Sequence, residues 1–208
     1  MSIKKIIRYQ NEEGFEFVHE PVEDSLKIEM CPDGYRAKYV ARDGCPSSPC
    51  DEDDPDLFLV AYHRDFTVKN SRLSEEKYNH LLSDRSGLDE YEMESLSEWD
   101  RHYHMFPLEA YIHSGIALAL GGEGQFLDRR WDVSALGCVF VAKSVWADIG
   151  DAIQAAKGLI ERWNGYLSGE VYGVVIESYD ELKKPVGRSS SWGFCGYDNA
   201  MIELEDVL

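Results

Sequence analysis

The chain has 208 residues, and its contents of 44% hydrophobic and 12% aromatic residues are those of a folded protein, which excludes wholesale disorder. Its 39 acidic and 21 basic residues give a formal net charge of −18, which opposes a large phosphate-binding face and so excludes direct nucleic-acid binding as the main activity. No apolar run approaches the roughly 18 residues of a membrane span, and the N-terminus has no signal-peptide core, so we expect a cytoplasmic protein without a membrane partner.

The length predicts a single domain over residues 1–208. We expect residues 1–42 to form a β-meander, 43–56 an acidic proline-rich loop, and 57–208 the main α+β body. The predicted fold is α+β, with a mixed, mostly antiparallel sheet covered by one long helix in the C-terminal half and by shorter acidic helices.

Two turn signals organise the predicted meander, Asn11–Gly14 and Pro32–Gly34. The strands that flank them are predicted over Ile3–Tyr9, Phe15–Val18, Leu26–Met30 and Tyr35–Ala41. The loop that follows holds three prolines and a run of carboxylates that cannot pack into a core: Asp51, Glu52, Asp53, Asp54 and Asp56. This run lacks the glycine and the distal glutamate of an EF-hand, so it does not indicate a calcium site. We expect no cofactor.

Leu57–Tyr62 is a continuous apolar run and predicts a strand buried on both faces. His63, Arg64 and Asp65 come directly after it. They are compatible with a surface ion pair and a capped histidine, or with a polar site at the edge of the sheet.

Two helices are predicted next, over Ser74–Leu82 and Leu88–Met105. The second carries a strongly acidic exposed face, and its inner side is predicted from Tyr91, Leu96, Trp99 and Tyr103. The acidic residues of that face are Asp89, Glu90, Glu92, Glu94, Glu98 and Asp100.

Strands are then predicted over Leu108–His113 and Ala135–Ala142. The segment between Pro107 and Lys143 holds the densest group of polar residues beside apolar strands, and such groups need partners once the chain folds. This group consists of His113, Ser114, Asp128 and Asp132, with Trp131 next to the last of them.

The longest predicted helix runs from Ser144, as N-cap, to Gly169. Its apolar stripe is Ile149, Ile153, Ala156, Ile160, Trp163 and Leu167, which predicts a helix lying across the sheet. After it we expect a strand at Val171–Glu177, a polar connector at Tyr179–Arg188, and aromatic residues between glycines at Ser189–Asn199 that close an edge of the core.

The five cysteines stand at irregular spacing and indicate free thiols in a reducing compartment. A zinc site from Cys31, Cys45, Cys50 and His63 would lack a C-x-x-C pair, so no metal site is predicted. A Cys138–His113 dyad can be drawn, but Cys138 falls inside an apolar strand, where thiols are usually inert. No established catalytic motif is present.

From Asp51 to about Tyr197 the chain resembles a family of uncharacterised proteins of bacteriophages and other mobile elements. The resemblance lies in the runs His63–Asp65, Tyr111–Gly115, Trp131–Gly137 with Val139–Val141, Tyr166–Gly173 and Ser191–Gly196, and in Phe126. The chain departs from the family pattern at Ala135, where that pattern has glycine. The resemblance implies a phage gene acting in the host cytoplasm but no established activity.

Charge and resemblance together predict an antagonist of a host defence protein that handles nucleic acid, of the anti-restriction or anti-CRISPR kind, acting by DNA mimicry or by steric block. Its partner would carry a basic nucleic-acid groove, and the predicted binding residues are Asp51, Glu52, Asp53, Asp54, Asp89, Glu90, Glu94 and Glu98. The alternative is a small enzyme acting on a nucleotide or base, with its site around His113, Ser114, Trp131 and Asp132. An accessory structural role is a third possibility, and the oligomeric state stays open.

Overall fold

A computed structural model describes the chain in two compact units, which are treated separately below. The terminal unit joins the two ends of the chain, Met1–Ser47 and Gly169–Leu208, and the central unit is Ser48–Ser168. The residues described are 7–10, 16–19, 21–22, 24–49, 54–63, 66–69, 73, 76, 79, 98–112, 115–121, 133–182 and 184–207.

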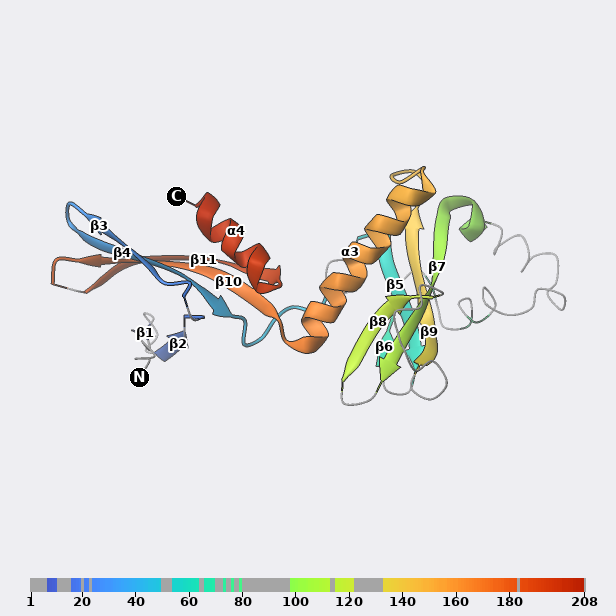
Figure 1. Ribbon diagram of the computed structural model, residues 1–208, viewed down its shortest axis with the longest axis horizontal. Coiled ribbons are helices and arrows are strands. Elements are labelled where there is room, and N and C mark those ends of the chain that lie inside the picture. The colour runs from blue at the N-terminus through green and yellow to red at the C-terminus, as the bar shows by residue number, and fades with distance from the viewer. Residues whose placement is uncertain are drawn as a thin grey trace. The chain divides into compact units, whose positions relative to one another are not determined.

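The terminal unit contains a four-stranded antiparallel sheet in the order β11-β10-β4-β3 (Figure 1). Its strands are β3 (Lys27–Cys31), β4 (Gly34–Arg42), β10 (Val171–Asp180) and β11 (Pro185–Cys195). A separate hairpin consists of β1 (Ile7–Gln10) and β2 (Glu16–His19). Both predicted N-terminal hairpins are therefore confirmed. Among the described residues the two hairpins do not pair with each other, and β4 pairs with β10 from the far end of the chain.

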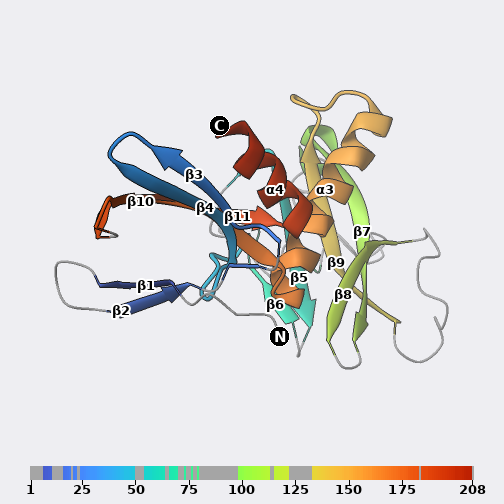
Figure 2. The same ribbon diagram turned by 60° about the vertical axis from the view of Figure 1, so that its left-hand side comes forward.

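The helix α4 (Tyr197–Asp206) covers one face of this sheet (Figures 1 and 2). Ala200 and Leu204 of α4 are fully buried against a small core that includes Val40 of β4 and Val174 of β10. This helix was not predicted. Its apolar pattern is short, and the segment Ser189–Asn199, which overlaps its start, was interpreted as closing an edge of the core.

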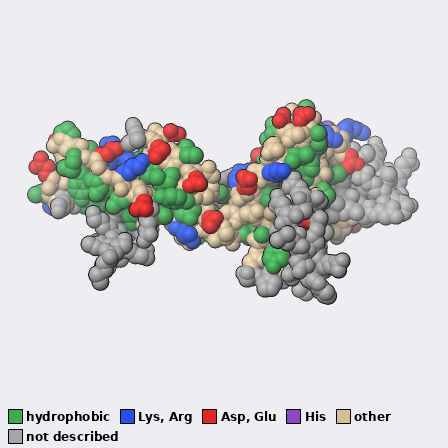
Figure 3. Space-filling model, in the orientation of Figure 1, with side chains coloured by type: hydrophobic (Ala, Val, Ile, Leu, Met, Phe, Trp, Pro, Cys, Tyr) green, Lys and Arg blue, Asp and Glu red, His purple; other side chains and the backbone are tan. Residues whose placement is uncertain are grey.

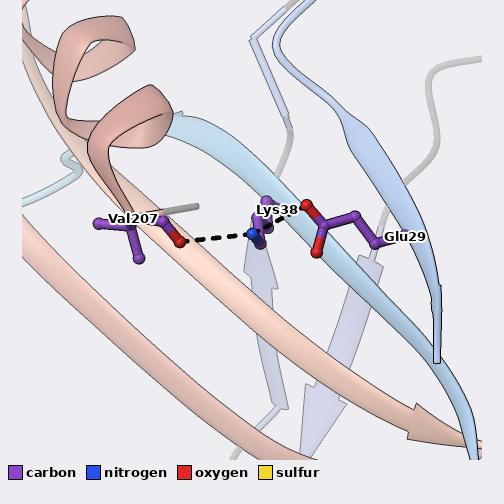
Figure 4. Close-up of polar contacts among 3 residues, drawn as sticks. All are labelled: Glu29, Lys38 and Val207. Carbon is purple, nitrogen blue, oxygen red and sulfur yellow. Dashed lines mark hydrogen bonds and ion pairs between the residues drawn. The ribbon is translucent and has the colours of Figure 1, made fainter. Parts of the chain in front are cut away.

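A buried lysine links the same face to the end of α4. The Nζ atom of Lys38, a residue only 2% exposed, donates a 2.9 Å hydrogen bond to Oε1 of Glu29 and a 3.4 Å bond to the carbonyl oxygen of Val207 (Figure 4). A cation at a helix C-terminus satisfies carbonyl groups that have no partner within the helix. Lys38 therefore holds β3 and the end of α4 together.

The central unit contains a five-stranded antiparallel sheet in the order β6-β5-β9-β7-β8. The strands are β5 (Leu57–His63), β6 (Phe66–Val68), β7 (Tyr103–Ile112), β8 (Ile116–Leu120) and β9 (Val133–Ala142). The predicted strand Leu57–Tyr62 is confirmed as buried on both faces, since its side chains alternate between two separate hydrophobic clusters. One cluster lies under the helix α3 (Ile149–Ser168), and the other is rich in aromatic rings.

The long helix α3 covers its sheet as predicted, but it begins five residues after the predicted N-cap, at Ile149 instead of Ser144. Oδ1 of Asp148 accepts hydrogen bonds from the backbone N–H groups of Gly150 (2.8 Å) and Asp151 (3.2 Å), so Asp148 is the capping residue. Gly169, with φ at +70°, follows the helix as expected.

The predicted stripe of α3 is confirmed in Ala156, Ile160 and Trp163, all of which are buried. The prediction that Ile149 belongs to the buried stripe is wrong, since this residue is 52% exposed at the first turn. Ala152 and Leu159 are buried, although the stripe did not include them. At the outer edge of the sheet, the side-chain amide of Asn164 accepts a 2.7 Å bond from the N–H of Leu118 and donates a 3.0 Å bond to its carbonyl oxygen. The helix thus provides β8 with the two bonds a neighbouring strand would make.

Two further boundaries correct the predictions. Residues 98–102 are helical, but Tyr103–Met105, placed at the end of the predicted acidic helix, belong to β7. Tyr179–Arg188 is not a connector, since β10 continues to Asp180 and β11 begins at Pro185. Of the predicted helix Ser74–Leu82, only Glu76 and Asn79 are described, and both are helical.

The α+β class is confirmed, and every strand pair among the described residues is antiparallel, so the predicted mixed sheet is not found there. Within the described parts of the chain, no helix is long and apolar enough to cross a membrane.

Candidate functional site: an acidic cleft on the central unit

Most of the residues predicted for a site lie outside the described part of the chain. These are Asp51, Glu52, Asp53, Asp89, Glu90, Glu94, His113, Ser114, Trp131 and Asp132. The structure describes two of the predicted binding residues, Asp54 and Glu98, and both are exposed. Asp54 belongs to the predicted acidic loop and Glu98 to the predicted acidic helix.

The ends of these two segments meet at one cleft in the central unit. The cleft has a volume of about 360 Å³ and contains a carboxylate from each segment, Asp56 from the loop and Glu98 from the helical turn. Its other lining residues are Trp99, His102, Tyr103, Ala142 and Ser144. The sequence predicted both acidic segments as binding segments. It could not predict that Asp56 and Glu98 share a cleft, because this depends on the pairing of β5, β9 and β7.

Backbone hydrogen bonds from the end of β9 position the walls of the cleft. The N–H of Ala142 donates to the carbonyl oxygen of Asp56 (2.7 Å), and the N–H of Lys143 donates to that of His102 (2.8 Å). Nζ of Lys143 donates to the carbonyl oxygen of Asp100. The end of β9 therefore lies between the loop and the helical turn and bonds to both.

An aromatic cluster supports the cleft from below. The rings of Trp99 and Tyr103 stack with their centroids 5.2 Å apart, and both pack edge-on against Phe58 and Phe140. Phe58 and Phe140 in turn stack on each other at 5.0 Å. Such packing restricts the rings, and so it holds the helical turn that carries Glu98 in a fixed place.

The side chain of Asp54 shapes the acidic loop that forms one wall of the cleft. Oδ1 of Asp54 accepts a 2.8 Å hydrogen bond from the N–H of Asp56, which is the local turn that aspartate favours. The carboxylate of Asp54 is thus partly occupied, whereas Asp56 and Glu98 line the cleft together with Trp99 and Tyr103. Acidic and aromatic residues in one cleft are suited to bind a guanidinium or ammonium group.

A larger hollow, of about 650 Å³, follows α3 past Gly158 and Leu57. It has one carboxylate, Asp151, and one guanidinium, Arg162, among mainly apolar walls. It therefore lacks the paired acidic groups that the predicted function requires.

The terminal unit holds a buried polar cluster that sequence reasoning missed. Oε2 of Glu177, a residue only 2% exposed, accepts a 2.8 Å hydrogen bond from the hydroxyl of Tyr179, and its Oε1 lies 3.8 Å from Nε of Arg188. Burial, with the nearby charge of Glu177, raises the pKa of Tyr39, and burial with the hydrogen bond to Glu177 raises the pKa of Tyr179. The period-two alternation of Val175, Glu177 and Tyr179 along β10 could have indicated this carboxylate, because it shares a face with a buried valine.

The structure argues against Cys138 as a nucleophile. The side chain is buried between strands, and this burial raises the pKa of the Cys138 thiol to about 12, partly offset by a hydrogen bond from the backbone of Phe106. The reactive thiolate is therefore scarce at neutral pH. His104 also has a structural role, since its Nε2 lies 3.0 Å from the carbonyl oxygen of Trp146.

Among the described side chains, no group of three or more His, Cys, Asp or Glu residues is arranged to hold a metal ion. On the face drawn in Figure 3, the acidic side chains of the terminal unit are scattered among hydrophobic and polar ones, whereas Asp56 and Glu98 of the central unit share one cleft. Compared with protein-family models, with curated proteins and with solved structures, the chain gives no match.

Proposed function

We propose that this protein binds the basic nucleic-acid groove of another protein and blocks it, as a phage-type antagonist of a host defence system in the host cytoplasm. The observation that supports the proposal is the shared cleft of Asp56 and Glu98. These residues belong to the two most acidic segments of the sequence, and the remaining proposed binding residues lie before them in the same segments. The function is therefore anti-restriction or anti-CRISPR activity through imitation of DNA.

The chemistry of the cleft fits an arginine-rich partner. A guanidinium group can pair with a carboxylate through two parallel hydrogen bonds and can stack on an aromatic ring at the same time. Glu98 and Trp99 are neighbours in the cleft wall and present both kinds of group. A basic nucleic-acid groove is a surface where arginine side chains are already arranged to meet regularly spaced negative charges.

The net charge of −18 adds a long-range contribution. It attracts a basic partner during the encounter and raises the association rate, whereas the close pairs in the cleft determine which partner stays bound. Because exposed charges are screened by salt, binding must weaken steeply as ionic strength increases.

The test is a capture experiment with a matched pair of variants. The immobilised protein is exposed to extract of bacterial cells, bound proteins are eluted with a salt gradient and identified, and their DNA cleavage is assayed with and without the protein. Asp56→Asn with Glu98→Gln removes two charges at the cleft. Asp198→Asn with Asp206→Asn removes two charges from exposed positions of α4 and serves as the control.

We expect a nucleic-acid-handling protein to be captured, its DNA cleavage to be inhibited, and elution to occur at clearly lower salt for the cleft variant than for the α4 control. Capture without any nucleic-acid-handling protein would contradict the proposal. Equal loss in the two variants would show that only the total charge matters and would exclude the cleft as the binding site.

A further inference from the structure

The strand β11 forms a long open edge of the terminal sheet. It contributes 11 residues at one end of the order β11-β10-β4-β3, and residues 185–187 and 189–193 are exposed. The outer backbone groups of an edge strand can pair with another strand, and proteins usually prevent this with short strands, charges or a covering segment. Among the described residues, no strand pairs with the outer side of β11.

Three other edge strands among the described residues, β8, β6 and β3, are short or partly occupied. Asn164 occupies both backbone groups of Leu118 on β8, and β6 has only three residues. The edge strand β3 has five residues and carries Lys27 and Glu29, both in ion pairs. The edge strand β11 is longer than these three, and unlike β3 it carries no acidic residue.

The sequence of β11 is nearly symmetric about Ser190. It reads Val-Gly-Arg-Ser-Ser-Ser-Trp-Gly-Phe from Val186 to Phe194, with serine, glycine and apolar residues at mirrored positions. When two identical strands pair antiparallel around a two-fold axis, each residue faces the one at the mirrored position of the other copy. Around Ser190 such pairing places serine opposite serine, glycine opposite glycine and Val186 opposite Phe194, so no two like charges of β11 meet across the axis.

The structure keeps the middle of this strand regular. The register with β10 shifts near Gly193 and near Val186, and between these shifts the pairs run without a break from Gly187 to Trp192. The five residues Arg188–Trp192, centred on Ser190, thus form a straight segment with the geometry that a further strand needs.

Trp192 is held in place before any partner binds. A Cβ atom on Gly173 would overlap the indole ring, so the ring lies across the backbone of β10 at that glycine, and Nε1 of Trp192 donates a 3.0 Å hydrogen bond to Oγ of Ser190. In the symmetric pairing, Arg188 of one copy stands opposite Trp192 of the other, and both side chains already contact β10, through Glu177 and Gly173.

Charge favours a second copy at this edge over other faces of the molecule. Two chains of net charge −18 repel each other, but β11 contains no carboxylate and one cation, Arg188, which already pairs with Glu177. The two copies can therefore approach along β11 with less repulsion than elsewhere.

We propose that two copies of the chain associate by antiparallel pairing of β11 with β11 around Ser190, so that one sheet continues through both copies with four strands from each. The proposal is independent of the cleft on the central unit. It also has the opposite response to salt, since screening of the like charges strengthens the dimer.

The first test is sedimentation equilibrium of the wild type over a range of concentrations, at low and at moderately high salt. We expect a reversible dimer whose dissociation constant falls as salt is added. Ser190→Lys places two like charges opposite each other on the axis and should weaken the dimer by about tenfold or more. Gln154→Lys on α3 makes the same change in net charge at an exposed position and should leave the dimer unchanged.

The second test does not depend on the folding of the lysine variant. In a chain with Cys45→Ala, Ser190→Cys should give a covalent dimer with a short bismaleimide. Gln154→Cys in the same background should give no more cross-linked dimer than the Cys45→Ala chain alone. A wild type that is monomeric at every concentration would overturn the proposal. Unchanged dimerisation of a folded Ser190→Lys variant, or no cross-link through Ser190→Cys, would exclude β11 as the interface.

Discussion

The hydroxyl of Tyr103 donates a 3.2 Å hydrogen bond to the backbone carbonyl oxygen of Pro55. It joins the start of β7 to the acidic loop, so one side chain both stacks on Trp99 and positions the residue before Asp56. The walls of the cleft are thereby connected at their base.

Removal of that hydroxyl tests the connection. Tyr103→Phe keeps the ring but not the bond, so we expect the free energy of unfolding to fall by less than about 1 kcal/mol. Hydrogen–deuterium exchange should become faster at the amides of Asp54 and Asp56, measured by mass spectrometry. Unchanged exchange at both amides would show that the loop is held by other contacts.

The control is Tyr103→Ala, which also removes the ring from the cluster with Phe58 and Phe140. Urea denaturation should then show a loss of about 2 kcal/mol or more. A loss no larger than that of Tyr103→Phe would contradict the role given to the aromatic cluster.

Cys138 gives the protein a defined alkaline sensitivity. Its pKa is raised from 9.0 to about 12 in the folded protein, so its stabilising effect is complete below pH 9 and is lost as the pH rises from 9 towards 12. At pH 10 the unfolded chain has released this proton and the folded chain has not. The wild type should lose about 1.4 kcal/mol from this group between pH 7 and pH 10.

The comparison is with Cys138→Ala, which has a lower stability at every pH but lacks this slope. Urea denaturation of both proteins at pH 7, 8.5 and 10 measures the difference, and the raised pKa values of Tyr39 and Tyr179 add to the loss only above about pH 10. If the stability of the two proteins changed in parallel with pH, the loss at alkaline pH could not be assigned to the raised pKa of Cys138.

The helix α3 offers a matched pair of isoleucines. Ile160 is buried in the core under the helix, and Ile149 is 52% exposed at its first turn. Ile160→Ala should cost about 2–5 kcal/mol because it leaves a cavity, whereas Ile149→Ala should cost less than about 1 kcal/mol.

Chemical denaturation of the wild type and of both variants, analysed with the same m-value, measures the two losses in the free energy of unfolding. A loss under 1 kcal/mol for Ile160→Ala would indicate that the helix does not cover its sheet. A large loss for Ile149→Ala would show instead that the first turn is buried in solution.

Local signals in the sequence were sufficient for the two N-terminal hairpins and for the C-terminal end of α3, but not for the start of that helix. Pro32–Gly34 predicted a turn because proline fixes φ and glycine admits positive φ, as Gly34 does at +147°, and the hairpin of β3 and β4 follows. The N-cap of α3 was misplaced because Ser144 and Asp148 are both good caps. Tertiary contacts decide between them, since the N–H groups of Val145 and Trp146 bond to the carbonyl oxygen of Ala142 and form a turn there instead.

The polar segment Tyr179–Arg188 was misinterpreted for a different reason. Polarity predicts a loop, but an edge strand such as β11 can carry polar residues on both faces because much of it is exposed to water. The pairing of β4 with β10 joins segments from opposite ends of the chain and has no local signal. The same holds for the cleft, where Asp56 and Glu98 meet only because β5, β9 and β7 are neighbours.

The amide of Asn164 has a consequence for how this protein would deteriorate in storage. The helix α3 covers its sheet, and its residue Asn164 bonds to the backbone of Leu118. A transient detachment of α3 therefore exposes apolar side chains and, at the same time, the unpaired backbone groups of the edge strand β8. Aggregation should therefore follow the frequency of that local opening more closely than the midpoint of global unfolding. Formulation conditions that favour the docked helix would extend the shelf life of the protein even where its melting temperature does not change.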